Sequence, residues 1–155
     1  MKIYIGRHAE AEPASVDVNQ GLTANGLMQA DQMGQYLAEL SVRPDQILHS
    51  VKARTRETAE IYAKHLDVHH VTECDTLLKE GMSISPLLDM IAVWKEDVLL
   101  VGHLPFIAKL LNALVLGDEQ LGPLYPFPLG GLVCVERVSH ERWVMQWAVD
   151  PMIIV

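Results

Sequence analysis

The amino-acid sequence predicts an α/β protein in which helices cover both faces of a mostly parallel sheet. Short apolar segments rich in β-branched residues alternate along the chain with longer segments whose apolar residues recur every three or four positions. Two further apolar segments near the end of the chain are separated only by a few polar residues, which indicates a hairpin at the sheet edge. We therefore expect a three-layer α/β/α sandwich with a mostly parallel central sheet and an antiparallel edge.

The overall composition is typical of a globular protein. A chain of 155 residues is expected to form one domain over residues 1–155. The net charge of -8 argues against nucleic acid as a partner. The most apolar stretch, 98–116, is interrupted by polar residues, and the first residues lack a signal-peptide pattern, so we expect no membrane partner and a cytoplasmic location.

The first half of the chain contains two predicted strands, each followed by a predicted helix. Lys2 to Gly6 has the composition of a short buried strand. Thr23 is placed to cap a helix that ends near residue 41. Gln46 to His49 is the second predicted strand, and Ala53 to Leu66 is the second amphipathic helix.

The second half repeats this alternation. Val68 to Val71 predicts a weaker third strand, and Ile84 to Trp94 has helical spacing. Asp97 to Val101 is a strongly apolar strand, and Phe106 to Leu116 returns to helical spacing.

The last part of the chain predicts a loop and a hairpin. Because Gly117 to Gly131 is rich in glycine and proline, we expect a surface loop there. Leu132 to Val138 and Arg142 to Ala148 are the two strands of the hairpin.

Basic and hydroxyl side chains stand just after three of the predicted strands. In chain order they are Arg7, His8, Ser50, Arg54 and His103. Ligands of open α/β sheets bind beyond the carboxyl ends of the strands. If these three strands are neighbours in the sheet, two arginines and two histidines meet in one pocket.

Such a pocket suits a phosphoryl group. Guanidinium groups carry a permanent charge and offer forked donors that match phosphate oxygens. A neutral imidazole can attack phosphorus and form a covalent intermediate, while fixed positive groups stabilise the charge of the transition state. Nearby arginines favour the neutral form of a histidine. We therefore expect no metal and no cofactor.

The ordered motifs around these residues resemble those of the histidine phosphatase superfamily, and most of all its short bacterial phosphohistidine phosphatases. The matching segments are Gly6 to Ala9, Leu22 to Gly26, Ser50 to Ala59 and Gly102 to Pro105. The resemblance implies a phosphoglycerate mutase-like fold, here without the helical lid of larger members. It also implies that His8 is the nucleophile and that Arg7, Arg54 and His103 form the phosphate pocket.

Three further residues are weaker candidates. Larger relatives have an acid near the leaving group, and Glu80 is the only carboxylate in the corresponding stretch, Leu77 to Gly81. Ser50 is a candidate for binding phosphate or loop backbone. Thr23 is first a helix cap and second a residue that shapes the pocket. We expect Lys52 and Arg56 to face away from Arg54 as surface charges.

The resemblance leaves the substrate open between three readings. An imidazole leaving group needs no strong acid, and a chain this short has little room for a lid, so a phosphohistidine on a partner protein is favoured, such as a phosphotransfer domain of two-component signalling. The second reading is a phosphatase of small phosphomonoesters that uses Glu80 as general acid. The third is a non-catalytic phosphate-binding module, suggested by Gly21 and Val51, where many relatives have proline.

Overall fold

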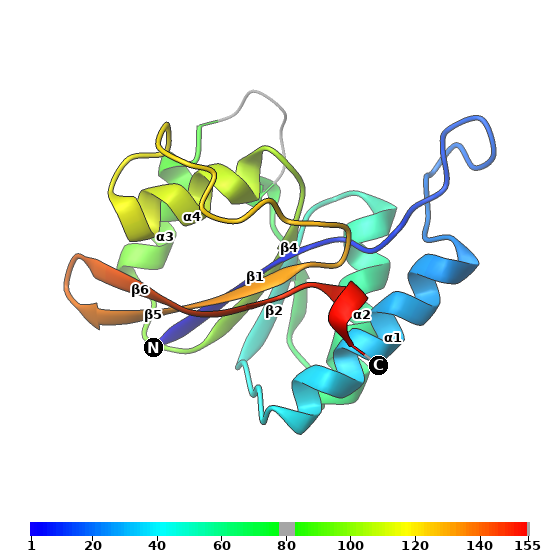
Figure 1. Ribbon diagram of the computed structural model, residues 1–155, viewed down its shortest axis with the longest axis horizontal. Helices are drawn as coiled ribbons and strands as arrows, with labels where there is room; N and C mark the ends of the chain where they lie inside the picture. Colours follow the sequence, from blue (N-terminus) through cyan, green and yellow to red (C-terminus); the bar gives the residue numbers. More distant parts are fainter. Residues whose placement is uncertain (78–82, 155) are drawn as a thin grey trace.

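A six-stranded mixed sheet forms the centre of the computed structural model, which describes residues 1–77 and 83–154 (Figure 1). The strand order is β3-β2-β4-β1-β5-β6. The strands are β1 Lys2–Arg7, β2 Gln46–His49, β3 Val71–Glu73, β4 Val98–Gly102, β5 Leu132–Ser139 and β6 Arg142–Val149. β1 to β4 run parallel, and β5 and β6 add antiparallel pairs beside β1. The expected sheet with an antiparallel edge is confirmed.

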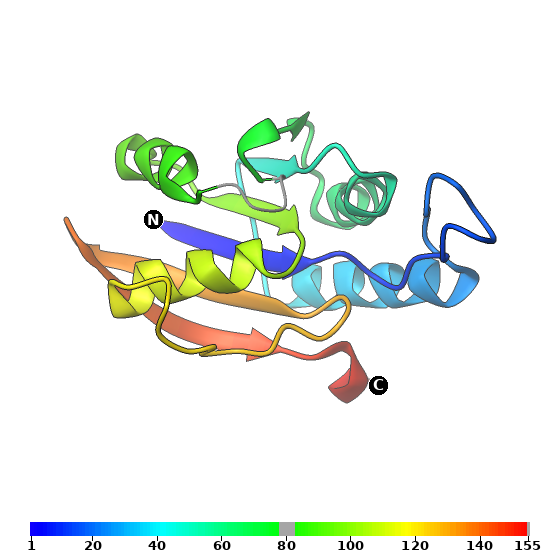
Figure 2. The ribbon, with the colours of Figure 1, turned by 90° about the horizontal axis from the view of Figure 1, so that it is seen from above.

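Helices lie on both faces of this sheet (Figures 1 and 2). The α-helices are α1 Ala24–Glu39, α2 Ala53–Leu66, α3 Ser85–Val93 and α4 Phe106–Leu116. α1 and α2 pack on one face, and α3 and α4 pack on the other. Two short 3-10 turns, Asp75–Leu77 and Pro151–Ile153, were not predicted. The three-layer sandwich is therefore confirmed.

The period-two alternation of β1 supplies both layers of the core. Ile3 and Ile5 are fully buried in the cluster formed with α3 and α4. Tyr4, between them, belongs to the cluster formed with α1 and α2. Because successive side chains of a strand point to opposite faces, one short segment anchors both helical layers. The end of β1 is thus held rigidly where the basic residues begin.

The third strand lies further along the chain than predicted. Val68 to Val71 was expected to pair, but β3 begins at Val71. Asp67 ends α2 in a left-handed conformation, with φ of 55°. The next residues connect this helix end to the sheet, and pairing starts only where Val71 lies beside Ile47 of β2. Tertiary register therefore overrode the local apolar pattern.

Candidate active site

The carboxyl ends of β1, β2 and β4 meet at one edge of the sheet, as predicted. β4 lies between β2 and β1, so His103 stands between Ser50 on one side and His8 on the other. The imidazole rings of His8 and His103 have centroids 5.5 Å apart. The backbone N–H of His8 donates to Gly102 O at 3.2 Å. Two histidines 95 positions apart in the numbering thus share one site.

His8 is held in one neutral tautomer. The residue is only 8% exposed, and its Nδ1 lies 2.7 Å from Ala9 O. A carbonyl oxygen only accepts, so Nδ1 must carry the hydrogen of this bond. The neighbouring backbone is fixed as well, since Ala9 N–H donates to Thr58 Oγ1 at 3.1 Å. Nε2 of neutral His8 therefore keeps its lone pair.

The segment expected to be a surface loop in fact supports this strand end. Phe127 is fully buried, and its carbonyl accepts a hydrogen bond of 3.0 Å from Nη1 of Arg7. Gly130 N–H donates to His8 O at 2.9 Å, and Gly131 O accepts from Arg7 N–H at 2.9 Å. Sequence reasoning missed these contacts because they use backbone groups, which leave no residue-type signal.

The positive charges of Arg7 and Arg54 repel one another at this edge of the sheet. Burial and the charge of Arg54 both lower the pKa of Arg7 from its ordinary value. Nε of Arg7 is buried and has no hydrogen-bond partner among the described residues. Like charges held together and an unsatisfied buried donor both cost free energy, and a bound anion would relieve both.

Both histidines are neutral near pH 7. Burial is the main cause that lowers the pKa of His8 to about 4; the bond to Ala9 O acts upward, and the charges of Arg54 and Arg7 add to the lowering. Burial, followed by the charge of Arg54 and smaller contributions from His8, Lys52 and Arg7, lowers the pKa of His103 to about 3. A neutral His8 is the form that can act as a nucleophile.

These shifts predict a loss of stability in mild acid. The unfolded chain takes up a proton on His8 near pH 6.5, whereas the folded protein resists protonation down to about pH 4. The free energy of unfolding should fall between these values, by about 3 kcal/mol from His8 alone. Urea unfolding at several pH values should show a shallower fall in His8→Asn than in the wild type. Parallel pH dependences in the two proteins would contradict a strongly lowered pKa.

An anion should stabilise the folded protein by binding between the arginines. Sulfate at about 100 times its Kd should raise the free energy of unfolding by about 2.7 kcal/mol, or roughly 5–10 °C in Tm. The measurement is a thermal melt in millimolar sulfate against chloride of equal ionic strength. Equal Tm values in the two salts would exclude a preformed anion pocket.

Three candidate site residues remain: Ser50, Thr23 and Glu80. Ser50 is fully buried, and its Oγ lies 2.5 Å from Nε2 of His103. Thr23 caps α1, where its Oγ1 accepts from Gly26 N–H at 2.8 Å and donates to Glu10 at 2.8 Å. Glu80 lies outside the described residues.

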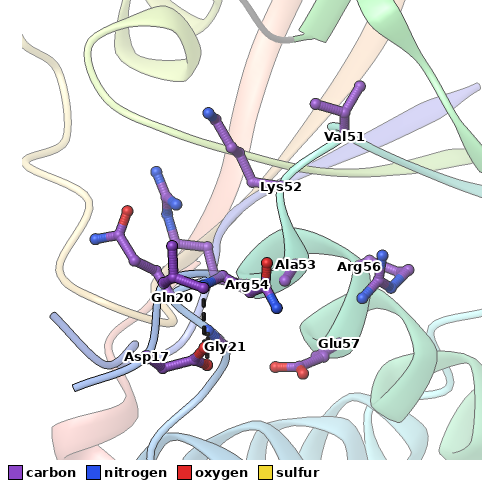
Figure 3. Close-up of a pocket in the computed structure, with 11 residues that line it drawn as sticks. Asp17, Gln20, Gly21, Val51, Lys52, Ala53, Arg54, Arg56 and Glu57 are labelled. Carbon is purple, nitrogen blue, oxygen red and sulfur yellow. Dashed lines mark hydrogen bonds between the residues drawn. The ribbon is translucent and has the colours of Figure 1, made fainter. Parts of the chain in front are cut away.

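A cavity of about 620 Å³ adjoins Arg54 (Figure 3). It lies between the 17–21 loop and the start of α2, and Lys52 and Arg56 line it as well as Arg54. Both residues are exposed, as expected of surface charges, and Arg56 points away from Arg54 in Figure 3. The expected direction was wrong for Lys52 alone. In Figure 3, Lys52 and Arg54 extend toward the same side.

The acidic residues of this cavity are already bonded to the loop backbone. Asp17 accepts N–H bonds of 3.0 Å from Asn19 and Gly21, and Glu57 accepts one of 2.7 Å from Leu22. A proline in place of Gly21 would lack the N–H that Asp17 accepts. The departure from the family pattern at Gly21 thus has a local structural reason.

Among residues 1–77 and 83–154, no three His, Cys, Asp or Glu side chains are grouped closely enough to hold a metal ion. Over the same ranges, every helix is too short or too polar to cross a membrane.

Comparisons with known proteins agree on one family for this chain. The family model of the histidine phosphatase superfamily (branch 1) matches residues 3–81, about half of the chain. Serine/threonine-protein phosphatase PGAM5, mitochondrial, of Xenopus laevis is 35% identical over 96 residues, which are 61% of this chain and 34% of the relative. The chain thus spans about a third of the length of the curated relatives it matches.

Two solved structures match nearly the whole fold. SixA from Agrobacterium tumefaciens has a TM-score of 0.79 and 28% sequence identity, covering 97% of this chain and 98% of its own. The protein histidine phosphatase SixA complexed with tungstate has a TM-score of 0.86 and 22% identity, covering 98% of each chain. The predicted likeness to short phosphohistidine phosphatases is thereby confirmed at the level of family and fold.

Proposed function

The chain belongs to the histidine phosphatase superfamily, branch 1, and on that premise we propose that it is a phosphatase that works through a covalent phosphohistidine on His8. The observation that carries the proposal is the neutral, backbone-fixed His8 beside His103, in the field of Arg7 and Arg54. A tetrahedral anion complements such a site in charge. Tungstate, bound by the similar SixA, is an anion of this shape.

The proposed reaction has two displacements at phosphorus. In the first, the Nε2 lone pair of His8 forms a bond to phosphorus while the bond to the substrate atom breaks, and the leaving atom keeps the electron pair and takes a proton from solvent water. In the second, water attacks the phosphorus of phospho-His8 and gives a proton to solvent, the electron pair of the P–N bond returns to Nε2, and phosphate leaves with neutral His8 restored. Arg7 and Arg54 stabilise the charge of both transition states. Since these groups supply positive charge, no metal is needed.

We propose a phosphohistidine of a partner protein as the substrate. A histidine leaving group departs as a weakly basic imidazole, so the reaction does not depend on a strong general acid. The cavity beside Arg54 gives room for the rest of a protein segment. The names of both similar proteins, a protein histidine phosphatase and a serine/threonine-protein phosphatase, support a protein substrate. A phosphotransfer domain of two-component signalling is our specific candidate.

The PGAM5 relative makes phosphoserine or phosphothreonine in a protein the second candidate. The test is a direct competition between a phosphorylated phosphotransfer domain and a phosphoserine peptide, with EDTA present throughout. We expect kcat/KM to be at least tenfold higher for the phosphohistidine protein. A preference for phosphoserine that disappears in Glu80→Gln would establish the second candidate instead. A sugar phosphate is measured in the same assay, to test small phosphomonoesters as substrates.

A further inference from the structure

A row of three side chains runs inward from the site. Nε2 of His103 lies 2.5 Å from Ser50 Oγ, which lies 2.7 Å from Thr55 Oγ1. Thr55 Oγ1 in turn lies 2.8 Å from the carbonyl oxygen of Lys52 and 3.1 Å from that of Ser50. Ser50 and Thr55 are both fully buried. Thr55 lies within the Ser50 to Ala59 segment but was not a candidate site residue, and the proposed chemistry does not use it.

The number of available hydrogens fixes the direction of these bonds. A threonine hydroxyl has one hydrogen, and carbonyl oxygens only accept, so Thr55 donates toward the backbone. Thr55 Oγ1 is then an acceptor for the single hydrogen of Ser50. With that hydrogen used, Ser50 Oγ can only accept from His103. Nε2 of His103 must therefore carry the ring hydrogen.

With the hydrogens in this direction, the hydroxyl of Ser50 has a partner for its hydrogen and for its oxygen. Its Oγ donates once to Thr55 and accepts from His103 Nε2–H and from Lys52 N–H, the latter at 3.3 Å. The reverse direction would deprive both carbonyl contacts of a hydrogen. It would also place a hydrogen on Nδ1 of His103, which is buried and has no partner among the described residues. An orphaned buried N–H is rarer and more costly than an under-used acceptor.

We infer that Ser50 and Thr55 are positioning residues that hold His103 as the neutral Nε2–H tautomer and fix its ring beside His8. His8 is held in the opposite tautomer, with its hydrogen on Nδ1. The two rings are thus locked by separate acceptors, one on a backbone carbonyl and one on a buried hydroxyl pair. This role in catalysis rests on the proposed function, whereas the tautomer itself does not.

The test replaces Thr55 with valine, which keeps the shape and removes the acceptor. Without Thr55 Oγ1, the hydrogen of Ser50 can turn to Nε2 of His103, so the ring hydrogen should move to Nδ1. We expect ¹⁵N NMR of the free protein to show the protonated and unprotonated nitrogens of His103 exchanged. The kcat should fall roughly tenfold with little change in KM. Thr55→Ser should restore both, and Thr72→Val, on exposed β3, is the matched control.

The ¹⁵N NMR measurement tests the tautomer of His103, and the kinetic measurement tests the role of that tautomer in catalysis. An unchanged His103 tautomer in well-folded Thr55→Val would overturn the inference. If that variant unfolds, Ser50→Ala is measured in the same way, and there the ¹⁵N signals of His103 must also differ from those of the wild type. Wild-type protein that turns over no phosphorylated substrate would defeat the proposed function and leave the NMR result standing.

Discussion

Replacement of His8 by alanine is expected to reduce phosphate release by roughly 10³-fold or more, because the reaction then loses its nucleophile. Without His8, water would have to attack the substrate directly, and one difficult displacement would no longer be divided into two. The remaining arginines would still bind the phosphoryl group. KM should therefore change far less than kcat.

The informative variant is His8→Asn, which keeps a polar group of similar size. It should fold, bind sulfate and release no phosphate. Brief exposure of wild-type protein to radiolabelled substrate should leave acid-labile, base-stable phosphate on His8, whereas the variant should carry none. The exposed His140→Ala is the control. Label on another residue, or equal turnover in His8→Asn and wild type, would refute the assignment.

The sequence could predict where the basic residues meet because their positions depend on simple features. Arg7 and His8 follow an apolar strand, and a parallel sheet brings the ends of its strands to one edge. The conditional step was the adjacency of the strands carrying His8, Ser50 and His103, and the order β2-β4-β1 confirms it. Apolar strands and amphipathic helices were therefore enough to predict the fold class and the sheet edge, whereas the meeting of these residues depended on a strand order that the patterns do not give.

What the sequence could not predict depends on the backbone and on hydrogens. The carbonyl of Phe127 and the amide of Gly130 support Arg7 and His8, yet a backbone group is present at every position. Thr55 looks like an ordinary helical residue until its distance to Ser50 is known. The register of a strand is also hard to predict from sequence. The pairing of Val71 with Ile47 is set by the neighbouring strand β2 rather than by the local apolar pattern of β3.

The electrostatics of the site link stability to function. Burying two histidines and placing Arg54 near Arg7 costs folding free energy, as the lowered pKa values of all three affected groups indicate. The same arrangement keeps His8 unprotonated and creates an excess of positive charge that a phosphoryl group can neutralise. Sites of this kind are expected to trade stability for activity.

Arg54→Ala is expected to lower kcat/KM by roughly 10²- to 10³-fold, the usual effect of removing one charge-stabilising donor from a transition state. The same substitution should raise the pKa of both histidines, since the charge of Arg54 contributes to lowering each of them. NMR titration of the imidazole signals measures this second effect without any substrate. Arg54→Lys should retain much of the low pKa values but little of the activity, because an ammonium group lacks the fork.

Arg56→Ala is the matched control for this substitution, since Arg56 lies on the same helix and its Nε is 4.0 Å from Glu60 at the surface. It should leave sulfate stabilisation and both histidine pKa values close to those of the wild type, and it should lower kcat/KM far less than Arg54→Ala does. If Arg54→Ala and Arg56→Ala lowered activity equally, the cations would act only as a general positive field around the cavity. If Arg54→Ala alone moved both the rate and the titration curves, Arg54 would act on the phosphoryl group and on the histidines at short range, in keeping with its charge lowering the pKa of both histidines.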